Sequence, residues 1–419
     1  MGAGMMAAGG ASAGQAVAGT GASAVELQAV LERFAGFGVK ASGGAGDNAC
    51  GDWLEGLLSA QGYACERQTF DVPFAEVRTA TLTTGGVQAQ VLPQGIVVPT
   101  GPGGLSGPLR LASSEAGLDG AIAVVVLPFR RWVSLADPTA SKPVADAFAR
   151  GAAAAVLVTT GPTGEAIALN VSATKPGFQK PVAVLAPKDA EPFLEAARAG
   201  QGATLTVDAT VGRRPAYNLI CRMDLGAAKT LIVTTPRSGW FDCVAERGSG
   251  LAVWLTLAQR LAAAKPKVNL EFVVTSGHEY IYLGGEEYLA HKAPKPADTH
   301  AWVHIGASAA ARDWHELGIL RPLPSADPQR VLTATPQFID LARAAFKGIS
   351  GLEAVYPADR ANAGGELVNV IAAGYGAAVG LYGGHRWFHT TGDDLRCSSG
   401  ELVAPVAAAF GAMITTILP

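Results

Sequence analysis

The stretch from Thr230 to Leu289 constrains the fold of this chain more than any other part of its sequence. Two β-prone runs, 231–234 and 270–274, enclose a segment whose apolar residues recur at helical spacing between Leu251 and Leu261. Both runs are apolar throughout, which is typical of strands that are covered on both faces and therefore of parallel pairing. The stretch predicts a strand–helix–strand unit within a parallel α/β sheet.

A polar, glycine-containing loop follows each of these predicted strands. In open α/β sheets, ligands bind where the loops leave the carboxyl ends of the strands. The first loop contains Glu246 and Arg247, and the second contains His278 and Glu279. These four residues are therefore the first candidates for chemistry.

The composition is that of a globular chain, with 49% hydrophobic and 16% charged residues. A length of 419 residues exceeds what one hydrophobic core usually supports, so we expect two domains. The formal net charge of −3 gives no electrostatic basis for nucleic-acid binding, and no run of about 18 apolar residues predicts a membrane span. The expected partner is a small-molecule or peptide-like substrate.

The N-terminal residues 1–22 are small, weakly apolar and uncharged. They fit the tail of a secretion signal, which would place the protein in the periplasm or outside the cell, and they equally fit a flexible leader on a cytoplasmic protein. The five cysteines match no CxxC metal spacing, and their odd number leaves at least one unpaired within the chain. We expect most of them to be buried structural residues.

Helical and strand patterns alternate along the chain on both sides of residues 85–211. The expected helices are 24–37, 47–62, 251–261, 336–345 and 399–417, and the expected strands are 63–72, 75–83, 231–234, 270–274, 301–305 and 377–382. This alternation predicts one doubly wound, mostly parallel α/β sheet built from residues 23–84 and 212–419. We predict that residues 85–211 form a smaller, β-rich α/β unit inserted into it.

The predicted insertion has a recognisable layout: GAIAVVVLP, then KPVADAFARGAAAAVLVTTG, then KPVAVLAPKDAEPFLEAARAG. This layout resembles a protease-associated domain. The resemblance implies a lid or a substrate-selecting insertion, and a plain structural insertion is the alternative.

Three motifs outside the insertion resemble those of the M28-type zinc aminopeptidases, the family that also includes the glutaminyl cyclases. Residues 245–250 (AERGSG) match the family's Asp-Asp-Asn-x-Ser-Gly helix start, His278 and Glu279 match its Glu-Glu pair, and 389–393 (HTTGD) match its late His-Thr motif. With the N-terminal helices, the resemblance covers nearly all of the chain outside residues 85–211. It implies the aminopeptidase fold and a hydrolase that acts on amide bonds.

The motifs depart from the family at the metal ligands. The first ligand motif falls on 236–238 (PRS), a later Asp ligand falls on Gly306, and His278 replaces the catalytic base. Two of the five usual ligand positions therefore cannot bind metal, so the resemblance implies at most one zinc ion, with a fourth position open to water. His278 would then be the general acid or base. The implied metal ligands are Glu246, Glu279 and His389, a set like that of the single-zinc glutaminyl cyclases.

A metal-free pocket is the alternative use of the same residues. Arg247 would pair with Glu279 in place of a lost cation, and Glu246 opens a helix, where a carboxylate is favoured without any metal. Ser238, on the turn after a buried strand, is then a candidate nucleophile with His278 as its base. A capping or turn serine is the simpler interpretation of Ser238.

Other polar and aromatic residues near these loops are candidates for substrate contacts. Strand alternation places His304 on the same face as the lost ligand position at Gly306. Aromatic residues are concentrated near the site, which favours an apolar or aromatic substrate group. The predicted substrate-contacting residues are Arg237, Trp240, Arg247, Tyr280, His304, Asp359, Glu366 and Trp387.

The sequence thus favours a hydrolase that cleaves an amide or related acyl bond in a small, partly apolar substrate. Two other hypotheses stay open. One is a metal-free hydrolase, cyclase or lyase that uses His278 in the same pocket. The other is a non-catalytic binding protein on the peptidase scaffold.

Overall fold

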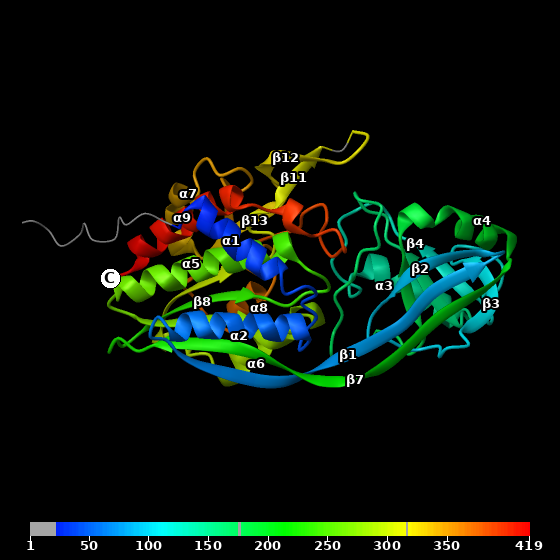
Figure 1. Cartoon of the computed structure of the whole chain (residues 1–419), viewed down its shortest axis with the longest axis horizontal. Coiled ribbons are helices and arrows are strands. Elements are labelled where there is room, and N and C mark those ends of the chain that lie inside the picture. The colour runs from blue at the N-terminus through cyan, green and yellow to red at the C-terminus, as the bar shows by residue number, and fades with distance from the viewer. Residues whose placement is uncertain (1–21, 175–176, 316) are drawn as a thin grey trace, which may run out of the picture.

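The computed structural model describes residues 22–174, 177–315 and 317–419. The predicted leader, residues 1–22, therefore lies almost entirely outside the described residues. A single large sheet runs through the whole molecule (Figure 1). Its central strands are parallel and lie in the order β9 (Asn269–Thr275), β8 (Thr230–Pro236), β10 (Thr299–Ile305) and β15 (Ala378–Gly383).

The sheet continues on both sides of these central strands. Beyond β15 lie β13 (Arg330–Ala334), which is antiparallel to β15, and β14 (Val355–Pro357). On the other side, β7 (Gly202–Met223) pairs antiparallel with β9. A separate hairpin is formed by β11 (Arg312–His315) and β12 (Arg321–Ala326).

Helices cover both faces of the sheet. Leu231 and Val233 of β8 point into the largest hydrophobic core, whereas Ile232 between them points into the core of the opposite face. The first face carries α1 (Ala24–Ala35), α2 (Ala45–Ser59), α5 (Ser249–Ala264), α7 (Ile339–Ala345) and α9 (Gly400–Ile417), and the second carries α6 (Leu283–His291) and α8 (Leu367–Ala372). The predicted doubly wound, mostly parallel α/β fold is confirmed.

Helix α9 is, within the described part of the chain, the one helix whose length and apolar composition would suit a membrane span. Half of it is nevertheless buried against the rest of the protein. It packs on α1, α5 and α7, and Val403 and Phe410 are fully buried in the core. A core helix of a large sheet has the same length and composition, and these contacts fit that interpretation.

A second unit lies at one end of the sheet, to the right in Figure 1. Its strands are β2 (Val87–Pro93), β3 (Leu105–Leu111), β4 (Ile122–Val126), β5 (Ala154–Val158) and β6 (Val182–Leu185), and its helices are α3 (Pro138–Ala149) and α4 (Glu191–Ala199). We call these elements and the loops between them the outer unit. It has hydrophobic cores of its own, separate from those of the main sheet.

A ribbon of two long strands joins the outer unit to the main sheet. Strand β1 (Ala64–Thr84) pairs antiparallel with β7 along its whole length, with one irregularity between Val77 and Thr79. The predicted break between two strands near Pro73 is therefore wrong. Strand β1 pairs with β2 only from Thr81 onward, so Pro73 lies on a sheet edge, where a residue without an N–H is tolerated. The domain boundaries after residues 84 and 211 stay a prediction, because both strands run through them without interruption.

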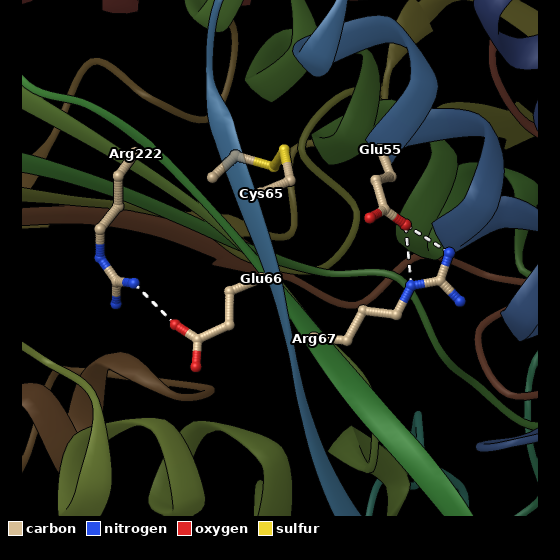
Figure 2. Close-up of a disulfide and its surroundings, with 6 residues drawn as sticks. Glu55, Cys65, Glu66, Arg67 and Arg222 are labelled. Carbon is tan, nitrogen blue, oxygen red and sulfur yellow. Dashed lines mark hydrogen bonds and ion pairs between the residues drawn. A yellow bond between two sulfur atoms is a disulfide. The ribbon is translucent and has the colours of Figure 1, made fainter.

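A disulfide links Cys65 of β1 to Cys221, the residue directly opposite in β7. Figure 2 shows the bond between two ion pairs, Glu66 with Arg222 on one side and Glu55 with Arg67 on the other. The remaining cysteines, Cys50, Cys243 and Cys397, are free and buried.

Replacing Cys65 and Cys221 together by serine is expected to lower the free energy of unfolding by about 2–4 kcal/mol. The bond joins residues that are 156 positions apart, so its loss releases a long loop in the unfolded chain. Urea unfolding of the double variant and of the wild type measures the difference. Wild type treated with a reductant should show the same loss, and an unchanged midpoint in both samples would contradict the prediction.

Candidate functional site

The candidate residues lie on two loops that follow β8 and β9 at the carboxyl edge of the sheet. After β8 the chain forms a turn of π-helix, Val244–Gly248, which leads directly into α5. The carboxylate of Asp393 accepts hydrogen bonds from the backbone N–H groups of Ala245 (2.8 Å) and Glu246 (3.0 Å). These bonds satisfy donors that the start of a helix leaves free, and they fix the turn that carries Glu246 and Arg247.

Glu246, Arg247 and His389 form a buried ionic cluster. One carboxylate oxygen of Glu246 lies 2.7 Å from Nη2 of Arg247 and 3.3 Å from Nε2 of His389. Nε of Arg247 donates to the carbonyl oxygen of Ser238 at 2.7 Å. Burial alone would raise the pKa of Glu246, but the Arg247 guanidinium and His389 hold that pKa well below its ordinary value. Glu246 is therefore ionised, with its charge balanced by Arg247.

Several polar atoms of this cluster have no hydrogen-bond partner although they are buried. They are Oε2 of Glu246, Nη1 of Arg247 and Nε2 of the neighbouring His304, whereas Oε1 of Glu246, Nη2 of Arg247 and Nε2 of His389 meet in the two ion pairs described above. Buried polar groups in native proteins almost always have a partner, in the protein or in bound water. Donors and acceptors that meet in one place therefore mark a site that can take up a polar ligand or water.

Glu279 does not join this cluster. One of its oxygens accepts hydrogen bonds from the backbone N–H and the hydroxyl of Ser42 (2.9 and 2.6 Å), and the other accepts from the hydroxyl of Ser238 (2.8 Å). Burial raises the pKa of Glu279. The structure therefore does not bring the three implied zinc ligands together, and Arg247 pairs with Glu246 rather than with Glu279.

A metal ion does not fit the implied ligand set. The oxygens of Glu279 are hydrogen-bonded elsewhere, and the guanidinium of Arg247 lies where it would repel a cation bound by Glu246 and His389. Over the described ranges, one group of His, Cys, Asp and Glu side chains approaches metal-binding spacing, and it is a different one: His385, Asp393 and Cys397. The implied zinc site is thus replaced by an arginine–carboxylate pair.

Ser238 is not placed as a nucleophile for His278. Its hydroxyl donates to Glu279 and accepts weakly from the backbone N–H of His278 at 3.3 Å, and its side chain is fully buried. The predicted serine–imidazole contact is absent between these two residues. The hydroxyl instead links the two site loops, through Glu279 and the backbone of His278, rather than capping its own turn.

His278 is oriented by Glu366. Its Nδ1 lies 3.1 Å from Oε1 of Glu366, which also accepts a hydrogen bond from the hydroxyl of Thr275 at 2.7 Å. The substrate contact of Glu366 stays a prediction; the described contacts of this buried side chain are with His278 and Thr275. Burial and the nearby Arg247 lower the pKa of His278 well below 6.5, so its imidazole is neutral at neutral pH.

Arg237 is a structural residue rather than a substrate contact. It is fully buried, its Nε lies 2.9 Å from Asp47, and Nη1 and Nη2 donate to the carbonyl oxygens of Val274 and Tyr217. The predicted role fails because its guanidinium is turned into the protein and stacks on the ring of Tyr217. The substrate contact of Asp359 stays a prediction: this residue is exposed and accepts hydrogen bonds from the residues that follow it in its own turn.

A loop of the outer unit lies directly on the candidate site. The backbone of Ala168 exchanges hydrogen bonds with His389, through the carbonyl oxygen (2.9 Å) and Nδ1 (2.8 Å) of the histidine. The N–H of Val171 donates to the carbonyl oxygen of Glu279 at 3.1 Å, and Nε1 of Trp240 donates to Asn170 at 2.9 Å. We call residues 168–171 the covering loop. It contacts His389 directly and so contributes to the burial of that side chain.

The predicted aromatic contacts mostly hold the outer unit in place. The ring of Tyr280 packs edge-on against Trp240, touches the core of the outer unit and donates its hydroxyl hydrogen to Pro73. Trp387 packs on Trp314 and is half-buried. These residues border the site, but their described contacts are with protein.

His304 lies under the cluster, as strand alternation predicts. Its Nδ1 is 2.9 Å from the hydroxyl of Thr234, and burial lowers its pKa to about 4. In the unfolded chain this histidine has a pKa of about 6.5, so as the pH falls the unfolded chain is protonated before the folded one. The contribution of neutral His304 to the free energy of unfolding is therefore fully present above a pH of about 6.5 and is lost as the pH falls below it.

Between pH 7 and pH 5, His304 is therefore expected to remove about 2 kcal/mol from the free energy of unfolding, at 1.36 kcal/mol per pKa unit. Urea unfolding of the wild type and of His304→Asn is measured at both pH values. The contribution of His304 is the difference between the two proteins in how much the free energy of unfolding changes with pH. Equal pH dependences would show that His304 does not titrate in this way.

Comparison with known proteins gives the fold a context. No protein-family model matches the chain, and no curated protein sequence does. Among solved structures, BSAP, a zinc aminopeptidase from Bacillus subtilis, is similar with a TM-score of 0.70 and 17% identity over 94% of this chain and 95% of that one. The aminopeptidase from Aneurinibacillus sp. strain AM-1 gives 0.68 and 17% over 94% of each chain, and a peptidase M28 precursor from Shewanella amazonensis gives 0.69 and 16% over 94% of each. At these identities the similarity establishes that nearly the whole chain has the fold of these peptidases.

Proposed function

We propose that this protein is a hydrolase that cleaves an amide or related acyl bond in a small, partly apolar substrate without a metal ion at Glu246 and His389. The observation that carries the proposal is the His278–Glu366 pair together with the nearby Nη1 of Arg247, which has no hydrogen-bond partner. A neutral imidazole held by a carboxylate is a suitable general base, and free guanidinium donors can stabilise a developing oxyanion.

Each residue would have a distinct part in the reaction. His278 takes a proton from the attacking water through Nε2, and later returns it to the leaving group. Arg247 donates hydrogen bonds to the carbonyl oxygen as it gains charge, while Glu246 keeps the guanidinium in place at 2.7 Å. Glu366 is a positioning residue, since it contacts Nδ1 of His278 rather than the ring nitrogen that takes the proton.

The surroundings of His278 support a partly apolar substrate. Its ring packs on Tyr282 with centroids 4.8 Å apart, and Trp240 and Tyr280 lie on the same two loops. Aromatic rings beside a few convergent polar groups are typical of sites for small ligands with an apolar part. The covering loop has to move away before such a substrate reaches Arg247.

A binding protein on the same scaffold is the second candidate function. The observation that favours it is the covering loop, which closes the cluster with hydrogen bonds on both sides. In that case Arg247 and Glu246 would hold a ligand that has both a carboxylate and a donor group, and no turnover would follow.

The experiment is a hydrolysis screen of the purified protein with acyl and aminoacyl p-nitroanilides and the matching p-nitrophenyl esters. We expect turnover of at least one compound with an apolar acyl group, and slower turnover of charged analogues. Calorimetric titration with the same acids and amides detects binding. Binding without turnover of any compound would reject the hydrolase and favour the binding protein.

A further inference from the structure

A second group of polar side chains lies behind the turn that carries Glu246 and Arg247. His385, Asp393 and Cys397 come from the loops between β15 and α9, and one potential ligand atom of each lies within 4.8 Å of the others. All three side chains are buried. Imidazole, carboxylate and thiolate are the donor types that bind zinc in proteins.

One ring nitrogen of His385 is hydrogen-bonded to the protein and the other is not, as is usual for a histidine that binds a metal. Its Nδ1 lies 3.0 Å from the hydroxyl of Ser308, while its buried Nε2 has no hydrogen-bond partner. Histidines that bind metals commonly use the second ring nitrogen in such a bond, which fixes the tautomer and the ring. Nε2 therefore faces Oδ1 of Asp393 at 3.4 Å without a hydrogen bond between the two atoms, and a shared ion would satisfy both.

The spacing of the donors suits one ion. Nε2 of His385 lies 3.4 Å from Oδ1 of Asp393. Two nitrogen or oxygen ligands at about 2.0–2.1 Å from a tetrahedral ion lie about 3.4 Å apart, so this pair needs no rearrangement. The sulfur of Cys397 has to move closer, away from its present hydrogen bond to the carbonyl oxygen of Gly392 at 3.3 Å.

Charge balance also favours a divalent cation. The carboxylate of Asp393 and the thiolate of Cys397 together carry two negative charges, which one divalent ion neutralises. The thiol proton is released to solvent when the metal–sulfur bond forms. Cys397 shares a small apolar cluster with Trp314 and Ala311, which limits access of water to the site.

We propose that His385, Asp393 and Cys397 bind one zinc-type divalent cation, at a site separate from the Glu246–His389 pair. Asp393 also accepts the backbone N–H groups of Ala245 and Glu246. The ion would therefore stiffen the turn that positions Glu246 and Arg247, and it would leave a fourth coordination position to water.

Cobalt substitution tests this proposal without any measurement of turnover, so its failure would leave the proposed hydrolase untouched. Wild-type protein, prepared without reductant and stripped by a chelator, is titrated with Co²⁺ and then with Zn²⁺. We expect one Co²⁺ per chain with a near-ultraviolet thiolate-to-cobalt absorption band that Zn²⁺ abolishes. The band should be missing in Cys397→Ser and unchanged in Cys50→Ser, which replaces another buried free thiol.

Two further measurements make the result independent of how Cys397→Ser folds. Ser308→Ala, which removes only the bond to Nδ1 of His385, should weaken Co²⁺ binding about 10–100-fold. In the wild type, Zn²⁺ should slow alkylation of Cys397 at least tenfold, and leave that of Cys50 unchanged. No binding, bound Co²⁺ without the thiolate band, a band that persists in Cys397→Ser, or equal alkylation rates would overturn the proposal.

Discussion

The His278→Asn variant is expected to lose about 10²–10⁴-fold in kcat/KM toward any substrate that the wild type hydrolyses. Asparagine fills a similar space and keeps a polar group beside Glu366, but it cannot take up a proton. Because the pKa of His278 lies well below 6.5, wild-type turnover should not fall between pH 7 and pH 6, where an ordinary histidine becomes protonated. Steady-state kinetics across this pH range, with circular dichroism of both proteins, measures the two effects.

Glu366→Gln is the matched variant for the positioning role. It keeps a hydrogen-bond acceptor for Nδ1 of His278 but removes the charge, so kcat should fall less than in His278→Asn while KM stays near the wild-type value. Asp359→Asn, an exposed carboxylate outside the cluster, serves as the control and should leave kinetics unchanged. Unchanged kcat/KM in His278→Asn would remove His278 from the mechanism.

Arg237→Met is expected to lower the free energy of unfolding by about 3–5 kcal/mol. Arg237 and Asp47 are both fully buried with their charges 2.9 Å apart, so the variant leaves a carboxylate in the interior without its counter-ion. Burial already raises the pKa of Asp47 in the presence of Arg237. Urea unfolding at pH 7 measures the loss.

Two companion variants separate the buried charge from other effects of this substitution. The double variant Asp47→Asn with Arg237→Met removes both charges and should be less destabilised than Arg237→Met alone. Arg67→Met removes a guanidinium that is 44% exposed and pairs with Asp52 and Glu55, and should cost about 1 kcal/mol or less. Equal losses in the two arginine variants would show that the buried pair does not hold the fold.

The large elements of the fold were predictable because their patterns are long. Helices α1, α2, α5 and α9 and the four central strands lie within a few residues of the predicted ranges, since each buries a continuous apolar stripe or run. Short elements were missed for the opposite reason. Strand β14 has three residues and α8 has six, so neither repeats its pattern long enough to be recognised. These elements are fixed by what packs on them rather than by their own sequence.

The location of the candidate site was predictable, but its contacts were not. Motif positions placed His278, Glu246 and His389 at one edge of the sheet, and the structure brings Glu246 and His389 to 3.3 Å. No pattern showed that Ser42, 237 positions earlier, donates hydrogen bonds to Glu279 and so takes that carboxylate out of the cluster. The role of Glu366 was missed likewise, because its distance from His278 depends on how α8 packs.

The outer unit is attached to the rest of the protein in two places. The ribbon of β1 and β7 joins it to the main sheet, and the covering loop contacts His389 and Glu279. The covering loop and Arg131, which forms an ion pair with Asp327 outside the outer unit, are both carried by that unit. The disulfide between Cys65 and Cys221 fixes the register of the two strands where the ribbon joins the main sheet. Because both contacts are carried by one packed unit, we expect any displacement of the covering loop to break the Arg131–Asp327 ion pair as well.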